Sequence, residues 1–541
     1  MTKSQILKPA LLLTLVIVHW SLFIGHCSLD IGHWTLAAQP PPPDPRFGAV
    51  EAFRDPVAAT EAGVGWERIL FYWSELQPNG PDDWNGYHVP DEWLNQAAAA
   101  GREVVAVLKH SPAWATDGLP GCGVPRGLEL PVDDPGNLWA AFVRRTVQIY
   151  NGRINHWIIW NEPDITPETY GAEWCGSVEE YYRLLKVAYL AAHQANPDVT
   201  IHLAGLTRWH DPGYLRRFLT IATQDPDGPE HGYYFDALSL HIYFRTETIP
   251  EIVGATQADL AAYGLQKQIW INELNAPSNF DPPYWELPGA NFDISLEEQA
   301  GFLLQTFALA LNQGADRIAV YKWLDGEMVV GSEPFGIIRS DYSRRPAYDA
   351  YRLITTHYAG AISARKDQQP LYTVVTLDRG DRTTRVLWAR TASDVTISLP
   401  ALSLQARLIE QSGVEQTIQP VEGQYTLTLP RARCADKRGC IIGGPTYLLV
   451  EEANSAPLAD ATTEPLPTEP LSKTVVSTPT EISTSTIPTD TITPLPTATP
   501  SLTPTASPTA TPTPTPTETA TPFSTPTTAP TETATQLSTP S

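Results

Sequence analysis

The chain has 541 residues, enough to bury a large core and to form more than one domain. It carries 36 basic against 60 acidic residues, a formal net charge of −24, and no run of basic residues occurs. Such a chain repels phosphate-rich molecules, so we expect no nucleic acid partner. The 16 Trp and 21 Tyr offer aromatic faces that suit sugar rings, although a large core explains them equally well.

The amino-terminal segment is typical of an export signal. Lys3 and Lys8 precede the apolar run PALLLTLVIVHWSLFIG, which at roughly 16 residues is short for a membrane-spanning helix. We therefore expect residues 1–38 to be a signal peptide, cleaved either before Ser28 or within 35–39, with an uncleaved membrane anchor as the alternative. The protein is then secreted or held at the extracellular cell surface.

Residues 39–358 alternate strand-like with helix-like segments, and amphipathic helices are predicted over 178–196 and 295–314. The predicted strands are 47–52, 66–72, 103–109, 154–161, 200–205, 235–243, 268–274 and 316–323. Eight strands alternating with helices predict an α/β fold of the (β/α)8 TIM-barrel type. A doubly wound open sheet is the alternative, but no Gly-rich phosphate loop follows the first strand.

Two of these strands end in a glutamate. The stretch WIIWNEPD carries Glu162 to the end of a buried strand beside Pro163, and INEL carries Glu273 to the end of another. Active sites of barrels lie at these carboxyl ends. Paired carboxylates, one protonated and one ionised, perform glycoside hydrolysis. Either glutamate alone is better explained as a satisfied buried acid or a helix cap, but the pair favours chemistry.

Side-chain alternation predicts which residues face the barrel interior. The polar side chains of the sixth strand share one face, which should point inward: Ser239, His241 and Tyr243. In the seventh strand, Glu273 is in phase with Ile269 and Ile271. In the fourth, strict alternation places Asn161 and Glu162 on opposite faces, so a shared site requires the pleat to break near Pro163.

These motifs resemble glycoside hydrolase clan A, and within it family 39-like or family 5-like members. WNEPD resembles the acid/base motif of the fourth strand, and INELNAP stands where the nucleophile belongs. LSLHIY, LKHSPAWA and YKWLDG resemble the sixth, third and eighth strands. The resemblance implies Glu162 as general acid/base and Glu273 as nucleophile.

The resemblance also implies substrate-binding residues. Asn161 would bind the sugar 2-hydroxyl, Tyr243 would hold Glu273, and Trp323 would form the platform under the sugar. The weaker candidates are His110, His241 and Trp73, and a satisfied core histidine is an equal reading of the two histidines. Trp114 is a further subsite candidate, with core packing as the alternative. No metal or other cofactor is expected.

We therefore predict a monomeric, retaining glycosidase acting on a β-linked poly- or oligosaccharide. The alternative is a catalytically inactive surface barrel that only binds carbohydrate. A metal-dependent barrel hydrolase is disfavoured because no His-x-His pair ends an early strand.

The rest of the chain differs in composition. Residues 359–453 read as a small all-β sandwich, beginning with a hairpin over 371–390 that turns at 378–381. Structural support is a better reading for this domain than glycan binding. Residues 454–541 are nearly all Thr, Pro, Ser and Ala, so we expect a disordered tail. It is either a stalk for cell-surface or cell-wall association or an inert linker.

Four cysteines lie beyond the export segment. Export permits disulfides. Cys122 follows the third strand and Cys175 the fourth, so their loops are neighbours and we predict a bond between them. Cys434 and Cys440 are predicted to close a second, short loop.

Overall fold

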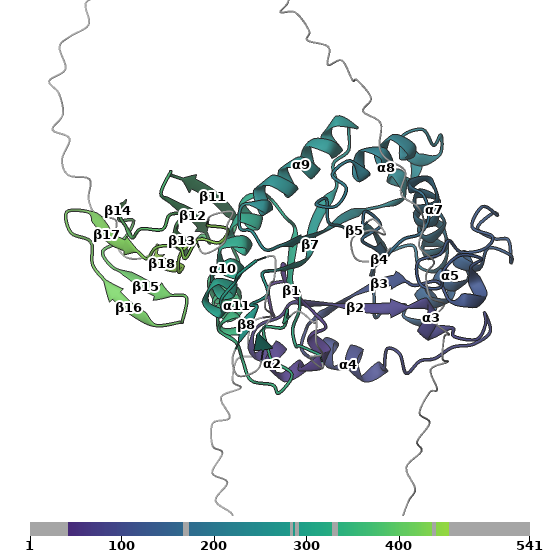
Figure 1. Ribbon diagram of the computed structural model, residues 1–541, viewed down its shortest axis with the longest axis horizontal. Coiled ribbons are helices and arrows are strands. Elements are labelled where there is room, and N and C mark those ends of the chain that lie inside the picture. Colours follow the sequence, from purple (N-terminus) through teal and green to yellow (C-terminus); the bar gives the residue numbers. More distant parts are fainter. Residues whose placement is uncertain are drawn as a thin grey trace, which may run out of the picture. The chain divides into compact units, whose positions relative to one another are not determined.

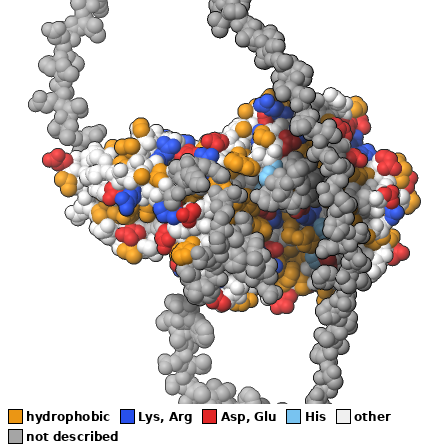
Figure 2. Space-filling model, viewed as in Figure 1, with side chains coloured by type: hydrophobic (Ala, Val, Ile, Leu, Met, Phe, Trp, Pro, Cys, Tyr) orange, Lys and Arg blue, Asp and Glu red, His pale blue; other side chains and the backbone are white. Residues whose placement is uncertain are grey.

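The computed structural model describes residues 42–165, 173–281, 285–286, 292–326, 334–434 and 440–453. The predicted signal segment 1–38 and the predicted tail 454–541 lie outside the described residues. Within the described ranges, no helix is both long and apolar enough to cross a membrane. Figure 2 shows acidic and basic side chains interspersed on one face of this part, without a large basic patch.

Eight parallel strands form a closed barrel (Figure 1). Around the barrel the strand order is β1-β10-β7-β6-β5-β4-β3-β2, and β1 pairs with both β2 and β10. The predicted barrel is confirmed, and the open sheet is wrong because no edge strand remains. The barrel strands are β1 Phe47–Val50, β2 Trp66–Tyr72, β3 Glu103–Lys109, β4 His156–Asn161, β5 Thr200–Leu206, β6 Ala237–Tyr243, β7 Gln268–Asn275 and β10 Arg317–Val320.

Helices cover the outside of the barrel (Figure 1). Two of them, α7 and α10, begin with capping boxes in which Ser177 pairs with Glu180 and Ser295 with Glu298. The predictions 178–196 and 295–314 therefore match these helices to within two residues at each end. The helices are α2 Pro56–Glu61, α3 Trp73–Leu76, α4 Asp91–Ala99, α5 Leu138–Ile149, α7 Val178–Ala195, α8 Tyr214–Ala222, α9 Thr248–Ala262, α10 Leu296–Asn312 and α11 Pro346–His357; short 3-10 turns are η2 Ala52–Arg54, η3 Ala113–Ala115 and η4 Gly228–Tyr234.

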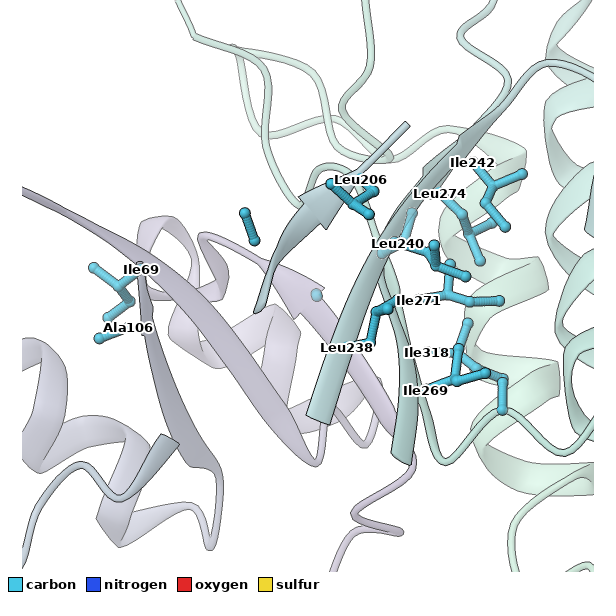
Figure 3. Close-up of a cluster of buried hydrophobic side chains, with 14 of the residues drawn as sticks. Ile69, Ala106, Leu206, Leu238, Leu240, Ile242, Ile269, Ile271, Leu274 and Ile318 are labelled. Carbon is cyan, nitrogen blue, oxygen red and sulfur yellow. The ribbon is translucent and has the colours of Figure 1, made fainter. Parts of the chain in front are cut away.

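The strands divide their apolar side chains between two cores. One cluster lies between the barrel and its helices, and Figure 3 shows its Leu238, Leu240 and Ile242 on β6. A second cluster fills the barrel interior: Trp66, Val105, Val107, Ile158, Ala237, Trp270 and Ala319. Ala237 is in phase with His241, so the predicted inward face of β6 is confirmed.

Strand β7 departs from the predicted phase. Ile269 and Ile271 face the helices, whereas Trp270 fills the interior. The pairing with β6 then shifts, because Leu240 lies opposite Ile271 but His241 lies opposite Glu273. The inserted residue is a β-bulge, which re-aims the side chains that follow it. The prediction that Glu273 shares a face with Ile269 and Ile271 is therefore wrong, and the bulge turns the carboxylate inward.

The residues after the barrel form the predicted antiparallel domain. A six-stranded sheet has the order β11-β12-β13-β18-β15-β16, and β14 pairs with β17. A separate apolar cluster lies among these strands, including Leu387, Ile397, Tyr425 and Leu449, as in a small sandwich. The strands are β11 Ser363–Gln368, β12 Tyr372–Asp378, β13 Arg382–Ala389, β14 Val395–Pro400, β15 Ala406–Glu410, β16 Glu415–Ile418, β17 Gln424–Leu429 and β18 Tyr447–Glu452; two further short strands, β8 Phe280–Asp281 and β9 Trp285–Glu286, pair with each other.

Barrel and sandwich belong to one compact unit. The fully buried Gln305 of α10 joins them: its amide donates to the Gly444 carbonyl (3.0 Å) and to Thr446 Oγ1 (3.1 Å). Its Oε1 accepts from the Gly443 backbone (3.0 Å) and from Thr246 Oγ1 (3.0 Å) in the loop after β6. These bonds support the structural reading of the sandwich.

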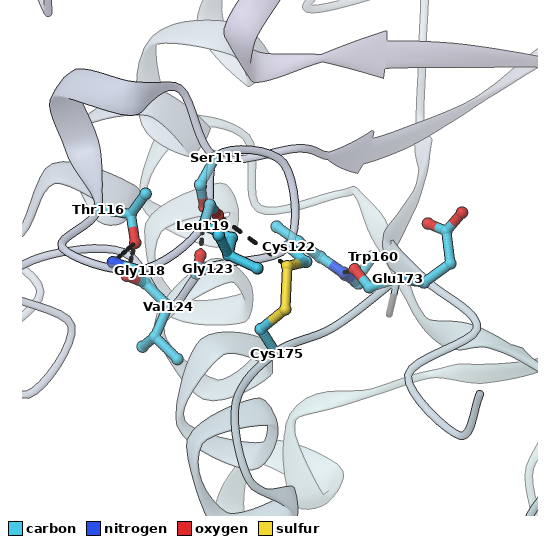
Figure 4. The surroundings of a disulfide bond; sticks show 10 residues. All are labelled: Ser111, Thr116, Gly118, Leu119, Cys122, Gly123, Val124, Trp160, Glu173 and Cys175. Carbon is cyan, nitrogen blue, oxygen red and sulfur yellow. Dashed lines mark hydrogen bonds between the residues drawn. A yellow bond between two sulfur atoms is a disulfide. The ribbon is translucent and has the colours of Figure 1, made fainter. Parts of the chain in front are cut away.

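Both predicted disulfides are present. Cys122 and Cys175 have Cα atoms 5.1 Å apart (Figure 4), and those of Cys434 and Cys440 are 3.8 Å apart. Beside the first bond, Trp160 Nε1 donates to the backbone carbonyl of Glu173 (2.7 Å). The disulfide, which joins the loops after β3 and β4, and this hydrogen bond together hold the backbone at Glu173.

Candidate active site

A cavity of about 850 Å³ opens at the carboxyl ends of the barrel strands. Five of the predicted site residues line it: Asn161, Glu162, His241, Tyr243 and Glu273. They come from β4, β6 and β7, and the cavity is within the usual size range of ligand pockets. The structure therefore brings the two predicted carboxylates into one site at the face where barrels carry their chemistry.

The end of β4 explains how Asn161 and Glu162 reach the same cavity. Trp160 and Glu162 both have left-handed backbones, with φ of 72° and 41°. The irregularity turns Trp160 outward against Trp139 and Trp174 and leaves both following side chains facing the cavity. The regular alternation of β4 therefore ends beside Pro163, as a shared site for Asn161 and Glu162 required. Asn161 Nδ2 also donates to Glu162 Oε2 at 3.4 Å.

Glu273 is a buried carboxylate held by two neighbours. The guanidinium of Arg68, from β2, forms an ion pair with its Oε1, and the Tyr243 hydroxyl donates to its Oε2. Burial alone would raise the pKa of Glu273, but the charges of Arg68 and His241 and the Tyr243 hydrogen bond outweigh it and lower that pKa. Burial, together with the Glu273 charge, raises the pKa of Tyr243 well above its usual value, so Tyr243 remains a donor. Glu273 is therefore kept ionised.

His241 links the two carboxylates. Its Nδ1 lies 2.6 Å from Glu162 Oε1 and 3.4 Å from Glu273 Oε2, while Arg68 Nη1 lies 3.3 Å from Nε2. One oxygen of each glutamate and one His241 nitrogen all lie within 4.8 Å of one another. His241 thus lines the cavity but is buried, with protein neighbours at both ring nitrogens, so its role as a substrate-binding residue stays a prediction.

Three predicted binding residues do not line the cavity. Trp323 is fully buried; its Nε1 donates to the Asp55 carbonyl (3.1 Å), and its ring packs against Tyr348 and Tyr351 of α11. Because β10 ends at Val320, the residue that reaches the cavity there is Tyr321. The prediction that Trp323 lines the cavity as the platform under the sugar is therefore wrong.

Trp73 is likewise buried, stacked on Phe142, with Nε1 bonded to Gln77 Oε1 at 2.7 Å. His110 lies outside the cavity lining, where its Nδ1 is 2.7 Å from Ser74 Oγ. Trp114 donates from Nε1 to the Gln77 carbonyl at 2.7 Å, also away from the cavity. All three are explained by packing and local hydrogen bonds.

The sequence interpretation missed several lining residues. Arg68 is a charged residue in the middle of a buried strand, and that position alone was a usable signal. Trp209, in the loop after β5, is 60% exposed although it lines the cavity. Lys109 also lines it and pairs with Glu173, and Arg245 follows β6.

Residues with left-handed backbones gather where the barrel strands end. Besides Trp160 and Glu162, they follow β1, β3, β5 and β6: Glu51, His110, Arg208 and Phe244, with φ of 59°, 78°, 52° and 70°. The left-handed conformation costs a residue with a Cβ about 1–3 kcal/mol of conformational energy, so it occurs only where the surrounding contacts stabilise it. Three of these four residues line or adjoin the cavity directly, since Glu51 and Phe244 line it and Arg208 precedes Trp209.

Glu162, His241 and Glu273 have the spacing of a metal site. The Arg68 guanidinium, however, lies against two of the three ligands and already balances the charge of Glu273. A cation placed there would be repelled by Arg68. The donor set therefore fits carboxylate chemistry better than metal binding.

No protein-family model matches the chain, and no curated protein matches it in sequence. Solved structures do match. A family 39 glycoside hydrolase from the gut symbiont Bacteroides cellulosilyticus WH2 is 18% identical, with a TM-score of 0.57 over 76% of this chain and 81% of that chain.

Two further structures have TM-scores of 0.50: a monomeric β-xylosidase from Caulobacter crescentus CB15 and a GH30 endoxylanase from Clostridium papyrosolvens C71. They are 16% and 12% identical, cover 77% and 76% of this chain, and are each matched over 97% of their own length. At such identities the likeness shows a shared fold. The fold that the motifs implied is confirmed.

Proposed function

We propose that the protein is a secreted glycoside hydrolase that cleaves a β-linked poly- or oligosaccharide with retention of configuration. The observation that carries this proposal is the spacing of the carboxylates. One oxygen of Glu162 and one of Glu273 lie within 4.8 Å. Retaining enzymes hold their carboxyl groups roughly 5–5.5 Å apart, whereas an inverting enzyme needs roughly 6.5–9.5 Å for its water.

In the first step, Glu273 attacks the anomeric carbon while the glycosidic bond to the leaving oxygen breaks. Arg68 and Tyr243 keep the attacking carboxylate ionised and fix its orientation. Glu162 gives its proton to the leaving oxygen. Asn161, which lines the cavity beside Glu162, hydrogen-bonds the sugar 2-hydroxyl in this proposal.

In the second step, water hydrolyses the glycosyl ester on Glu273. Glu162, which gave its proton to the leaving oxygen in the first step, accepts a proton from this water while the ester bond to Glu273 breaks. His241, hydrogen-bonded to Glu162 and close to Glu273, is a positioning residue for both carboxylates.

The test is hydrolysis of a panel of aryl β-glycosides, followed by proton NMR of the first-formed sugar. We expect the retained anomer, and EDTA dialysis should leave the rate unchanged. Glu273→Ala should abolish turnover, with azide restoring part of it as the inverted product. Glu162→Ala should spare the first step for substrates with good leaving groups, because they need little protonation.

Glu92→Ala, an exposed carboxylate of α4, is the matched control and should retain full activity. Release of the inverted anomer by the wild-type enzyme would contradict the nucleophile role of Glu273. Sugar binding without turnover would instead support the inactive carbohydrate-binding barrel.

A further inference from the structure

Arg245 differs from the other charged residues of the cavity. The other fixed cations of the cavity, Arg68 and Lys109, are paired with Glu273 and Glu173. Glu51 is paired with Arg54, and Glu162 with His241. Among the described residues no ion pair includes Arg245, and its buried Nε, like that of Arg68, has no hydrogen-bond partner. A buried polar group without a partner is rare and calls for an explanation.

The residues that follow Arg245 in the chain are bound to the sandwich and to α10 rather than to Arg245. Glu247, the acidic residue closest to it in sequence, pairs with Arg390 of the sandwich at 3.2 Å. Thr246 donates its backbone N–H to the Ile441 carbonyl (3.0 Å) and its hydroxyl to Gln305. The backbone of Arg245 itself donates to the Tyr243 carbonyl at 2.9 Å. The loop is therefore fixed from the sandwich side, and the guanidinium is left for a molecule in the cavity.

Trp209 lies in the loop that follows the adjacent strand β5. The buried carboxylate of Asp164 anchors this loop: it accepts from the Thr207 hydroxyl (2.9 Å) and from the Arg208 backbone (2.7 Å). The Arg208 side chain is itself paired with Asp259 at 2.7 Å. An exposed indole on a loop held this firmly offers a preformed flat face, and sugar rings stack on such faces.

We propose that Trp209 and Arg245 form a subsite for a uronic acid unit of the carbohydrate substrate. The indole covers the sugar ring and the guanidinium pairs with the carboxylate, a planar match that Arg makes well. This inference rests on the proposed function and names a substrate class for the same cavity. Because the whole chain carries a charge of −24, it opposes a polyanion, so the acidic units are isolated ones on an otherwise neutral chain.

The test compares sugars that differ only at the carboxylate. D-Glucuronate and D-glucose, and D-galacturonate and D-galactose, are used as inhibitors of aryl β-glycoside hydrolysis. For at least one pair we expect the acid to inhibit about tenfold or more strongly than its neutral parent, as a charge-assisted contact predicts. Raised salt should reduce that ratio.

Variants separate the two contacts. Arg245→Gln should bring the ratio of inhibition constants for acid and parent sugar close to one, whereas Trp209→Ala should weaken the acid and its parent together. The controls are Arg126→Gln and Tyr87→Ala, an exposed Arg and an exposed Tyr outside the cavity, and both should behave as wild type. Equal inhibition by acid and parent, no inhibition by any of the four sugars, or a preference that survives in Arg245→Gln overturns the proposal.

Failure of the proposed function gives a different result. If no aryl glycoside is hydrolysed, the binding of the same four sugars is measured by calorimetry with the full chain. A preference for the acid that is lost in Arg245→Gln would then support the subsite even without turnover, and equal binding would reject it.

Discussion

Replacing Gln305 tests how the sandwich is attached to the barrel. Gln305→Leu keeps a similar side-chain volume but removes both the donor and the acceptor of the amide. The Gly443 N–H and the Gly444 carbonyl then lose their side-chain partner. Each unsatisfied group costs about 1–3 kcal/mol, and because Gly443 is only half-buried we expect a loss of about 2–4 kcal/mol in the free energy of unfolding. Thr246 Oγ1 also loses its acceptor, and Thr446 Oγ1 loses its donor.

Urea denaturation followed by tryptophan fluorescence measures this loss as a lower midpoint. The matched control is Gln257→Leu in α9, whose exposed amide makes a single bond to the Gln313 carbonyl, and it should stay within about 0.5 kcal/mol of wild type. Since Thr246 adjoins Arg245, KM for the substrate should also rise in Gln305→Leu. Equal midpoints for the two variants would refute the idea that these hydrogen bonds hold the domains together.

Three further predictions concern the site, the disulfide and the tail. Tyr243→Phe removes one of the interactions that lower the pKa of Glu273, so the acid limb of kcat/KM should move to higher pH than in wild type. An unmoved limb would show that this bond does not set the charge of Glu273. Cys122→Ser with Cys175→Ser opens a loop of 53 residues and should lower the unfolding free energy by about 4 kcal/mol, measured under non-reducing conditions; a change below about 1 kcal/mol would contradict this. A chain that ends at Asn454 should keep its melting temperature and its rate on aryl glycosides, because the tail expected from the sequence would add no core. A large drop in either would contradict that expectation.

Much of the fold follows from local patterns. Apolar runs and capping residues near each segment predict where strands and helices lie, and these signals need no knowledge of distant partners. The strand predicted over 316–323 is the partial exception, because β10 ends at Val320. Beyond it the backbone of Lys322 pairs with a distant segment: its N–H donates to the Phe335 carbonyl (3.2 Å), and its carbonyl accepts from the Ile337 N–H (3.0 Å). That pairing depends on residues far along the chain, so residues 316–323 alone do not show it.

The site was predicted less completely, for a related reason. Glu162 and Glu273 could be found from the strand ends, but the bulge that turns Glu273 inward depends on how β7 pairs with β6. Trp323 was misplaced because strict continuation of the strand was assumed. Arg68 completes the network around Glu273 from a strand far away in sequence, so only the closed barrel brings the two residues together.

The left-handed residues at the strand ends have a consequence for anyone who wishes to make this protein more heat-resistant. Glycine or asparagine at these positions would relieve an unfavourable conformation, so several sites where stabilising substitutions are easy to find lie beside the cavity. At Glu162 the same substitution would remove the proposed general acid. Selection for thermal tolerance alone should therefore drift toward catalytically poor variants, and a useful screen must score turnover in the same round.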